Sequence, residues 1–507
     1  MSNIEKGNFS EDKTINFLSQ TLLKNIKTIK NSLGNSNDII IREFMIGKPI
    51  EIPIAIIFTD GLADNTSVTD FIIESIIRNF EINSETTLQD ITLQLKTQCL
   101  SVGSIKDIVD FPSLFNAILN GDTVILLNGS TKGIATSTKS AKDRAILEPA
   151  TESVIRGPRE SFTETLRTNT ALIRRKIKSP NLWIKSRVIG KVTQTEIAVM
   201  YINGIADEKI VKEVLDRLDR IDIDSVLESG YIEQLIQDSK FTLFPTVFNS
   251  ERPDVIAGDL LEGKIAILVD GTPFVLIVPA LFSSFLQSAE DYYQNAIISS
   301  FVRLIRFFGI SLALVAPSLY ISLTTFHQEM IPTPLLISIY AQREGIPFPA
   351  IVEAFIMEIA FEVLREAGLR MPRMIGPAIS IVGTLIIGQA AVEAGIVSAA
   401  MVIIVALTAI CSFLFPAYGL SNSIRMLRFP LMVLAAMFGL FGIFIGLMFL
   451  IIHLCSLRSF GVPYMSPFAP LIPQDQKDAL IIFPRGSLLT RPRLISQTNN
   501  VRGRKNK

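Results

Sequence analysis

The sequence predicts a protein of two unlike parts. The first is an α+β soluble N-terminal region of two tandem, similar α/β subdomains. The second is an α-helical transmembrane domain of about four spans plus a re-entrant or interfacial helix. Hydrophobic residues make up 49% of the 507 residues and charged residues 19%, and the mean hydropathy is +0.41, which is too apolar for an ordinary soluble protein. Segments apolar and long enough to cross a bilayer begin only near residue 304, and an internal repeat divides the region before them.

Shifts in composition divide the chain into six regions. The tail is distinct because Pro484–Lys507 holds several Arg and Lys residues and no Asp or Glu. The regions are a variable N-terminal segment at 1–38, the first α/β subdomain at 39–150, a basic connector at 151–193, the second α/β subdomain at 194–295, the transmembrane domain at 296–456 and a basic cytoplasmic tail at 457–507.

The first subdomain opens on Glu51–Gly61, an apolar, β-branched run that ends in Asp-Gly, which is typical of a buried strand and its turn. Asp64 then stands where an N-cap would start a helix that runs to about Asn79. Further on, Thr123–Asn128 and Gly133–Thr136 predict two strands joined by a turn that contains glycine.

The same pattern returns in the second subdomain. A strand-like run at Glu196–Gly204 is followed by a helical run at Glu208–Arg220, and its landmarks repeat those of the first copy. The near-constant offset indicates a tandem duplication, with the alternative that any strand–turn–helix unit resembles any other. The matches are Ala55 with Ala198, Gly61 with Gly204 and Asp64 with Asp207, each at an offset of 143, and Gly121–Gly129 with Gly263–Gly271 at an offset of 142.

The connector between the copies is basic. We expect it either to contact anionic lipid headgroups or a partner, or to form a solvated helix whose charge Glu160 and Glu164 partly neutralise. The candidate contact residues are Arg156, Arg159, Arg174, Arg175 and Lys176.

Several function classes are not favoured. Net charge is zero, so nothing favours nucleic-acid binding. Three cysteines without a CxxC pair and two histidines supply no metal set and no Ser/His or Cys/His arrangement, so we expect no cofactor and no enzyme. Glycine-rich dinucleotide and Walker A motifs are absent. Because Met1–Gln20 is polar, we expect no signal peptide and place the soluble region in the cytosol.

Four full spans are expected in the second part, with Arg303 and Arg306 at its start favouring a cytosolic N-terminus. Arg425 and Arg428 fall in the loop before the last span. Gly439, Gly442 and Gly446 place small residues suited to close helix packing in that span. The spans are Leu304–Phe326, Met374–Ile396, Ala399–Phe415 and Pro430–His453, and the second and third could form a tight hairpin or one broken helix.

The segment Pro349–Pro372 is apolar almost throughout and still carries Glu358, Glu362, Arg365 and Glu366. At about 100° per residue these four fall within about 100° of one another, which makes one charged stripe. Carboxylates at membrane depth are costly and usually lie beside water, a partner charge or an ion. We therefore expect the three glutamates, with Gln389 and Glu393, to line an ion pathway and Arg365 to form a gating salt bridge. Alternatively, the stripe faces headgroup water on an interfacial helix or pairs internally.

Five stretches of the chain resemble a known family. They are Thr165–Trp183 (TLRTNTALIRRKIKSPNLW), Phe244–Phe282, Glu353–Arg373 (EAFIMEIAFEVLREAGLRMPR), Ile375–Ser398 and Ser459–Pro470 (SFGVPYMSPFAP). These motifs are long and unusual, and they resemble the A subunit of bacterial spore germinant receptors, the GerA-type family. The resemblance runs from about Ile155 to Pro473 and more weakly over Ile40–Glu148.

The resemblance implies an integral protein of the spore inner membrane that acts with a transporter-like B subunit and a lipoprotein C subunit. Nutrient binding, expected on the B subunit, would release monovalent cations and then dipicolinic acid. The A subunit is expected to oligomerise into the conducting part, so the leading prediction is a subunit of a nutrient-gated cation channel. The alternatives are a secondary transporter that moves a solute itself and a non-conducting membrane scaffold or signalling subunit.

Overall fold

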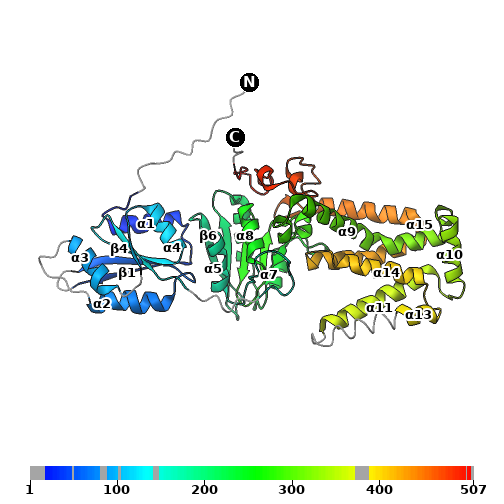
Figure 1. The fold of residues 1–507 in the computed structure, drawn as a ribbon, viewed down its shortest axis with the longest axis horizontal. Coiled ribbons are helices and arrows are strands. Elements are labelled where there is room, and N and C mark those ends of the chain that lie inside the picture. The colour runs from blue at the N-terminus through cyan, green and yellow to red at the C-terminus, as the bar shows by residue number, and fades with distance from the viewer. Residues whose placement is uncertain are drawn as a thin grey trace, which may run out of the picture.

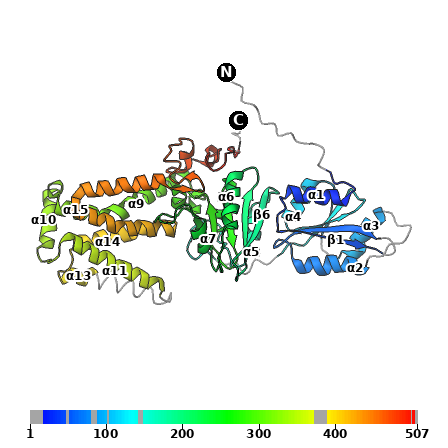
Figure 2. The same ribbon diagram turned by 180° about the vertical axis from the view of Figure 1, so that it is seen from behind.

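The structure is a computed structural model that describes residues 17–47, 51–79, 88–100, 104–140, 148–370, 388–497 and 499–503. These residues form an elongated molecule with two α/β subdomains at one end and a bundle of helices at the other (Figure 1). The view from behind shows the same sequence of parts, with the second subdomain between the first and the bundle (Figure 2).

The first subdomain is a five-stranded antiparallel sheet with the strand order β1-β2-β4-β5-β3. Side chains alternate between its two faces, so Ile54 and Ile56 of β2 enter one apolar core while Ala55 and Ile57 enter the other. The strands are β1 (Ile39–Ile46), β2 (Ile52–Thr59), β3 (Ile105–Ile108), β4 (Asp122–Leu127) and β5 (Gly133–Ser137); the helices are α1 (Leu22–Ser32), η1 (Ser67–Glu74), α2 (Ser75–Asn79), α3 (Leu88–Gln94), η2 (Leu95–Cys99) and α4 (Phe111–Leu119).

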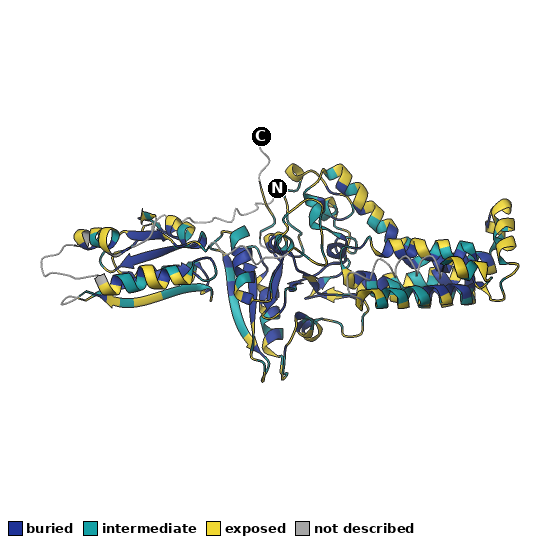
Figure 3. Cartoon of the chain, turned by 60° about the horizontal axis from the view of Figure 1, so that its bottom comes forward, coloured by how far each residue is buried: buried dark blue, intermediate teal, exposed yellow. Residues whose placement is uncertain are grey.

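The second subdomain has a five-stranded sheet in the equivalent order, β6-β7-β9-β10-β8. Helices α5 and α8 contribute to one core of its sheet and α6 and α7 to the other, and buried residues follow the strands of both subdomains (Figure 3). The strands are β6 (Leu182–Ile189), β7 (Thr195–Ile202), β8 (Phe248–Ser250), β9 (Ile265–Val269) and β10 (Val275–Val278); the helices are α5 (Leu166–Lys176), α6 (Glu208–Asp219), α7 (Ser229–Ile236) and α8 (Pro253–Leu261).

A buried asparagine makes the same pair of hydrogen bonds at the start of each subdomain. Asn25 accepts from the backbone N–H of Ser19 at 2.8 Å and donates to its carbonyl at 2.7 Å. Asn169 accepts from the N–H of Thr163 at 2.8 Å and donates to its carbonyl at 2.6 Å. Each asparagine thereby fixes the chain entering the first helix of its subdomain, where backbone groups would otherwise lack partners.

Two expected boundaries differ from the observed packing. The segment at 1–38 was expected to be separate, but Ile26 and Ile29 of α1 pack in the core of the first sheet. The connector at 151–193 holds α5, whose Leu172 and Ile173 pack in the core of the second subdomain. Both helices are amphipathic, with apolar residues three or four positions apart. Polar residues outnumber the apolar ones, so the composition of each segment hides the apolar stripe that the sheet buries.

The bundle contains two helices long and apolar enough to cross a membrane, α9 and α15, and a shorter apolar helix, α14, within the described ranges. The expected count of four spans is therefore not reached by length and composition alone, and most of the expected span Met374–Ile396 lies outside the described residues. The helices are α9 (Ala296–Thr325), α10 (Thr333–Arg343), α11 (Ala350–Arg370), α13 (Ala390–Glu393), α14 (Ala399–Ser412) and α15 (Tyr418–Ser456), with 3-10 turns η3 (Phe282–Leu286), η4 (Ala289–Tyr292) and η5 (Gln328–Met330).

Helix α15 is broken at Gly439, which has φ 60° and ψ −140°. Ser423 in its first half donates a hydrogen bond to the carbonyl of Leu243. His453 in its second half lies 3.0 Å from the hydroxyl of Thr242. Because adjacent residues of one loop hold both ends, the chain turns back at Gly439, and α15 is two helical segments side by side.

Arg425 and Arg428 lie inside α15, so their expected place in a loop before Pro430 is wrong. Proline fits within the first half of this helix although it lacks a backbone donor. The expected single span Pro430–His453 is also wrong, because the helix begins at Tyr418 and the break at Gly439 divides that range between the two segments. The reason is physical: both guanidinium groups have carboxylate partners on α11, which a hydropathy pattern along α15 alone does not reveal.

The described part of the expected basic tail folds back onto the second subdomain. Phe460, Val462 and Ile495 are buried in its core. Arg491 donates to the carbonyl of Leu261 at 2.8 Å. This segment, residues 457–497 and 499–503, is therefore a packed element rather than a free tail. It includes β11 (Arg458–Ser459), β12 (Val462–Pro463), η7 (Asp475–Asp478) and η8 (Arg485–Ser487).

The contact between the subdomains can be tested at Gly34, which has φ +64° and whose added Cβ would overlap the indole of Trp183. Gly34→Ala is expected to displace the indole, break the bond from its Nε1 to the carbonyl of Ser32 and shift its emission to longer wavelength. Trp183 is the only tryptophan of the sequence, so intrinsic fluorescence reports on this contact alone.

Gly204→Ala is the matched control, because Gly204 has φ +77° and nothing within 4 Å of an added Cβ. Both variants should lose about 1–2 kcal/mol of stability through the left-handed backbone. Only Gly34→Ala should lose more stability than this and shift the Trp183 emission. Equal thermal midpoints and unshifted spectra in both variants would contradict the packing described here.

Candidate functional site

The centre of the bundle holds a buried ion pair between Glu358 of α11 and Arg428 of α15. Thr408 of α14 lies 3.3 Å from the carboxylate. The Nε of Arg428 donates to the carbonyl of Ala313 in α9 at 2.7 Å. One pair of charges thus joins four helices. An isolated charge in such a place would be several kcal/mol less favourable.

A second ion pair, half-buried, joins α11 and α15 one turn further along. The Nε of Arg425 lies 2.8 Å from Glu362, and its Nη1 donates to the side chain of Asn422 at 2.9 Å. Arg365, expected to hold one of these carboxylates, contacts Asn422 at 3.4 Å and stacks over the ring of Tyr418. Arg425 and Arg428 therefore partner the glutamates in place of Arg365, because they project from a helix that the sequence pattern did not place beside α11.

The second pair lines a cavity of about 300 Å³ between α11 and the first half of α15, whose wall is partly charged and partly apolar. Two carboxylates and two guanidinium groups surround it, so the cavity contains both signs of charge. Such a cavity can hold water or a small ion without leaving a charge unpaired. Its lining residues are Glu362, Arg365, Glu366, Leu369, Tyr418, Asn422, Arg425, Met426 and Phe429.

The other expected pathway residues lie on exposed surfaces of the single chain. Glu366 pairs with Arg370, four residues on in the same helix. The side-chain amide of Gln389 donates to Glu393 at 3.0 Å. The structure thus brings Glu358 and Glu362 into the bundle, leaves the exposed Glu366 at the edge of the cavity, and leaves Gln389 and Glu393 on the outside of the bundle.

A third buried carboxylate, Glu353, was not among the expected site residues. It pairs with Arg343 at 3.2 Å and accepts from the backbone N–H and the hydroxyl of Ser398 at 3.1 and 2.9 Å. The same hydroxyl lies 3.2 Å from that of Tyr320 in α9. Glu353 precedes Glu358 by five residues, about 140° around the helix, so a search along one stripe misses it; a search for every carboxylate in the apolar segment would have found it.

The three glycines of α15 serve the turn and a close approach. A Cβ on Gly439 would lie 2.7 Å from a ring carbon of His327, which follows α9. A Cβ on Gly446 would lie 2.6 Å from Leu431 in the other half of α15, and Gly442 faces the backbone of Leu434. Only hydrogen fits at these places, which agrees with the expected role in helix packing.

The basic residues of the connector are largely engaged within the soluble region. Arg174 is buried and holds Asp38 with two hydrogen bonds of 2.7 and 3.1 Å, so it is not available to a membrane surface as expected. Arg175 also interacts within the chain, and Arg156 is exposed. The other pairs are Arg159 with Glu148 at 3.3 Å and Lys176 with Glu160 at 2.8 Å.

A buried charge cluster joins the soluble region to α9. Arg303 bonds to Asp291 at 3.3 Å and to Asp478 at 3.2 Å, and Arg306 bonds to Asp291 at 2.7 Å. The hydroxyl of Tyr292 lies 3.0 Å from Asp478. Burial raises the pKa of Asp478 to about 6. The cluster thus ties the start of α9 to Asp291, which precedes the bundle in the sequence, and to Asp478, which follows it.

A second polar cluster holds the segment before α5 against the start of α8. The hydroxyl of Ser250 donates to Glu152 at 2.6 Å, and Glu251 accepts from the backbone N–H of Thr151 at 2.5 Å. Tyr293, just before α9, donates to Asp254 at 2.6 Å. Burial raises the pKa of Glu152 to about 7, because the charged form loses solvation.

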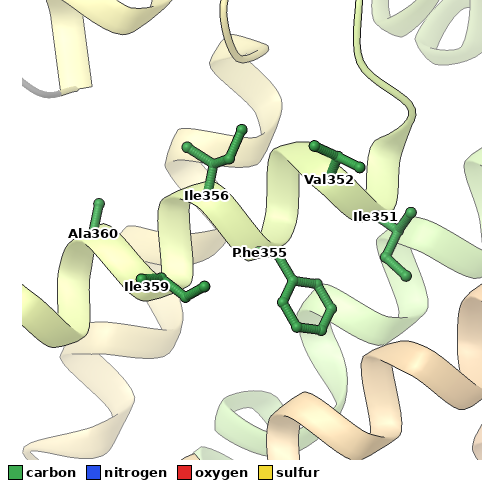
Figure 4. Close-up of a pocket in the computed structure, with 6 residues that line it drawn as sticks. All are labelled: Ile351, Val352, Phe355, Ile356, Ile359 and Ala360. Atoms are coloured by element: carbon green, nitrogen blue, oxygen red, sulfur yellow. The ribbon is translucent and has the colours of Figure 1, made fainter.

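No group of three or more His, Cys, Asp or Glu side chains in the described ranges is placed to hold a metal ion. On the outer side of α11 lies an open, almost wholly apolar groove of about 530 Å³. Figure 4 shows its lining residues, Ile351, Val352, Phe355, Ile356, Ile359 and Ala360, along one stretch of the helix.

Two α/β subdomains joined to an apolar bundle with internal ion pairs define a membrane-associated protein with a large soluble region. The family model for Bacillus/Clostridium GerA spore germination protein matches residues 27–494. The chain therefore belongs to the GerA family of spore germination proteins. This is a family of germinant receptor proteins and not of enzymes.

Several relatives match over nearly the whole chain. Spore germination protein KA of Bacillus subtilis (strain 168) is 51% identical over 96% of this chain and 88% of its own length. Spore germination protein GerLA of Bacillus cereus is 39% identical over 96% of this chain and 97% of its own length. The solved N-terminal domain of the A subunit of the Bacillus megaterium spore germinant receptor GerK3 is 41% identical, with a TM-score of 0.42; the match covers 53% of this chain and 98% of that one.

Breaking the central pair from one side should destabilise the bundle. Glu358→Gln leaves the buried guanidinium of Arg428 without a counter-charge and is expected to cost about 3–5 kcal/mol. Combining Glu358→Leu with Arg428→Met removes both charges and should recover most of the loss. Thermal unfolding of the detergent-solubilised protein measures both effects.

The matched control is Glu366→Gln, which removes a carboxylate of the same helix from an exposed pair and should cost less than about 1 kcal/mol. A Glu358→Gln variant as stable as this control would show that the pair does not hold the helices together.

The pKa of Glu152 predicts a pH dependence of stability. A raised pKa means that the folded protein keeps a proton that the unfolded chain releases above the ordinary value of 4.5. Stability should therefore fall as the pH rises from about 4.5 through about 7. Glu152→Gln should remove this part of the slope and, at pH 8, stabilise the protein by about 3 kcal/mol.

The measurement is the thermal midpoint between pH 5 and 8 for the variant and the parent. Burial also raises the pKa of Glu233 to about 7, so only the difference between the two proteins reports on Glu152. Glu160→Gln, at a more exposed carboxylate paired with Lys176, is the control for the removal of one negative charge. An identical slope in Glu152→Gln would refute the assignment.

Proposed function

We propose that this protein is the A-type subunit of a nutrient-sensing germinant receptor in the spore inner membrane, where it oligomerises into a nutrient-gated cation channel that triggers germination. Membership of the GerA family supports the receptor role. The observation that carries the channel role is the pair of arginine–glutamate contacts inside the bundle, Glu358–Arg428 and Glu362–Arg425. Apolar helices can pack together without such charges, whereas charged side chains at membrane depth are a feature of ion pathways.

We place α11 across the membrane rather than along its surface, in place of the re-entrant or interfacial helix. Its 21 residues span about 31 Å, which suits the hydrocarbon thickness. Near its start Glu353 bonds to Ser398, just before α14; towards its end Arg365 reaches Asn422, close to the start of α15. Ser421 in turn bonds to Ser412 at the end of α14. Helix α11 thus runs the length of α14.

Gating would be a shift of population between two arrangements of α11 and α15. In the arrangement seen here, Arg428 and Arg425 neutralise Glu358 and Glu362, which closes the path to cations. Nutrient binding on a transporter-like B subunit would favour an arrangement in which these carboxylates separate from the arginines and face the ion path. Glu366, Gln389 and Glu393 are exposed in the single chain, and in the oligomer their carboxylate and amide groups would form rings around the path. A lipoprotein C subunit completes the proposed receptor.

We further infer that the two subdomains arose by duplication and lie on the cytoplasmic side. The equivalent strand orders and the equivalent bonds of Asn25 and Asn169 support the duplication. Both ends of the bundle chain, at Ala296 and Ser456, are next to the second subdomain and the packed C-terminal segment (Figure 1). Arg303 and Arg306 at this side agree with the excess of basic residues on cytoplasmic faces.

Two other classes make different predictions. A secondary transporter would move a solute itself, and the broken helix α15 is a feature of that class. A non-conducting scaffold would use the ion pairs only for stability. Reconstitution of the receptor into liposomes separates the three: nutrient-gated ion flux supports the channel, solute counterflow the transporter, and neither supports the scaffold.

The gating role can be tested at the second pair, which is less buried than the first. Arg425→Gln leaves Glu362 without its cation and is expected to raise potassium efflux from spores in the absence of nutrient. The double variant with Glu362→Gln removes the charge and should return basal efflux to the parent level.

Arg78→Gln is the control, because it frees Glu74 of an exposed pair in the first subdomain, away from the bundle, and should leave basal efflux unchanged. Unchanged efflux and selectivity in Glu358→Gln and Glu362→Gln, with the protein at normal levels, would remove the pore role from the stripe.

A further inference from the structure

The loop after α7 carries an exposed phenylalanine beside the ends of the bundle helices. Phe241 is 100% exposed, more than any other large apolar side chain in the described part of the chain. The residues after it are tied to the bundle. The Thr242 hydroxyl lies 3.0 Å from Nε2 of His453, and the carbonyl of Leu243 accepts from Ser423. Phe241 is therefore held where both halves of α15 meet the soluble region.

Helix α7 continues this apolar surface. Tyr231 and Leu235 are exposed and lie four residues apart on one side of α7. Leu227, also exposed, directly precedes Glu228, the N-cap of this helix. Ile232 and Ile236 point the other way into the core of the second subdomain. Both views put α7 on the side of this subdomain towards the bundle (Figures 1 and 2). We call Leu227, Tyr231, Leu235, Phe241 and Leu243 the α7 surface.

Acidic groups near the α7 surface are engaged elsewhere. Asp238 bonds to Arg217 at 2.7 Å and to the backbone N–H of Phe460 at 2.6 Å. Glu228 accepts from the N–H of Gly230 and the hydroxyl of Thr272. Lys240, next to Phe241, is exposed. The surface therefore presents apolar and aromatic groups with a positive charge beside them.

We propose that the α7 surface rests on the membrane and inserts Phe241 at the boundary between lipid headgroups and acyl chains. Two features identify lipid as the occupant: Thr242 and Leu243 are bonded to the ends of the apolar helices of α15, and the exposed groups are those that favour this depth. Aromatic and leucine side chains bury apolar area there, and a lysine meets anionic headgroups. The proposal requires that the bundle lies in a membrane and does not depend on ion conduction or on the nutrient.

This contact would do what the basic connector was expected to do. Arg174 of the connector is buried against Asp38, whereas the α7 surface is open and lies next to the bundle. With Phe241 in the lipid, the second subdomain would be held at a fixed tilt to the leaflet. A movement of the ends of α15 would then be resisted by the lipid contact as well as by the protein.

The test uses the full chain in bilayers with lipids brominated near the headgroup end of the acyl chains. Phe241→Trp should add emission at short wavelength that these lipids quench almost completely. The parent emission comes only from Trp183, in β6 on the side of the second subdomain away from the bundle, and should not change. Leu235→Trp gives the same reading from the helix if Phe241→Trp fails to assemble.

The matched control is Phe71→Trp, at a half-exposed phenylalanine of the first subdomain, which should emit at long wavelength without quenching. Added emission from Phe241→Trp and Leu235→Trp that is long-wavelength and unquenched would overturn the proposal. Emission that is short-wavelength but unquenched would also overturn it, since it would assign the α7 surface to contact with protein.

Discussion

The buried pair between Glu358 and Arg428 determines how the helices of the bundle meet. Each charge alone would be strongly unfavourable in an apolar environment, so the two groups must be brought together wherever the bundle forms. The pair fixes the register of α11 against α15, and its remaining bonds to Thr408 and Ala313 bring in α14 and α9. One Nη of Arg428 has no hydrogen-bond partner among the residues described. The cluster is therefore not fully satisfied, which lowers the cost of a second arrangement relative to a fully bonded core.

A second set of charges fixes the bundle to the soluble region. Asp291 precedes α9, Arg303 and Arg306 lie within it, and Asp478 comes from the far end of the chain. This cluster closes a loop of the chain that includes the whole bundle. The second subdomain, the start of α9 and the packed C-terminal segment consequently move as one unit or exchange these bonds.

The sequence alone predicted part of the soluble architecture. Asp-Gly and Asn-Gly turns, β-branched runs and the offset of 143 residues are local signals, and they placed β2, β4, β7 and β9 because strand and turn chemistry acts over a few residues. The helices α1 and α5 were assigned to separate segments, since their polar residues outnumber the narrow apolar stripes that the sheets bury.

The site was predicted in part, for a related reason. The stripe on α11 is visible as charge in an apolar helix, but its partners Arg425 and Arg428 lie 63 and 70 residues further on. A pairing over that distance depends on the packing of two helices, which no local pattern encodes. From the sequence alone, the two arginines therefore looked like part of a polar loop. Glu353 was missed because it does not lie on the charged stripe, although it bonds to Ser398 and Arg343 in the structure.

The two subdomains, whose strand orders are equivalent, are also covered by the chain in a similar way. At the edge of the first subdomain, Asn120 accepts a hydrogen bond from Lys178, which lies just after α5, at 2.7 Å. In the second, Arg502 bonds to Glu262, which lies 142 residues after Asn120. In each subdomain, the chain that follows it in the sequence thus bonds to the same edge. For the second subdomain this chain is the C-terminal segment, which covers the edge as a capping segment does in repeat proteins. Because that cap also carries Asp478 to Arg303, any rotation of the second subdomain relative to α9 must either move the C-terminal segment with it or break this contact.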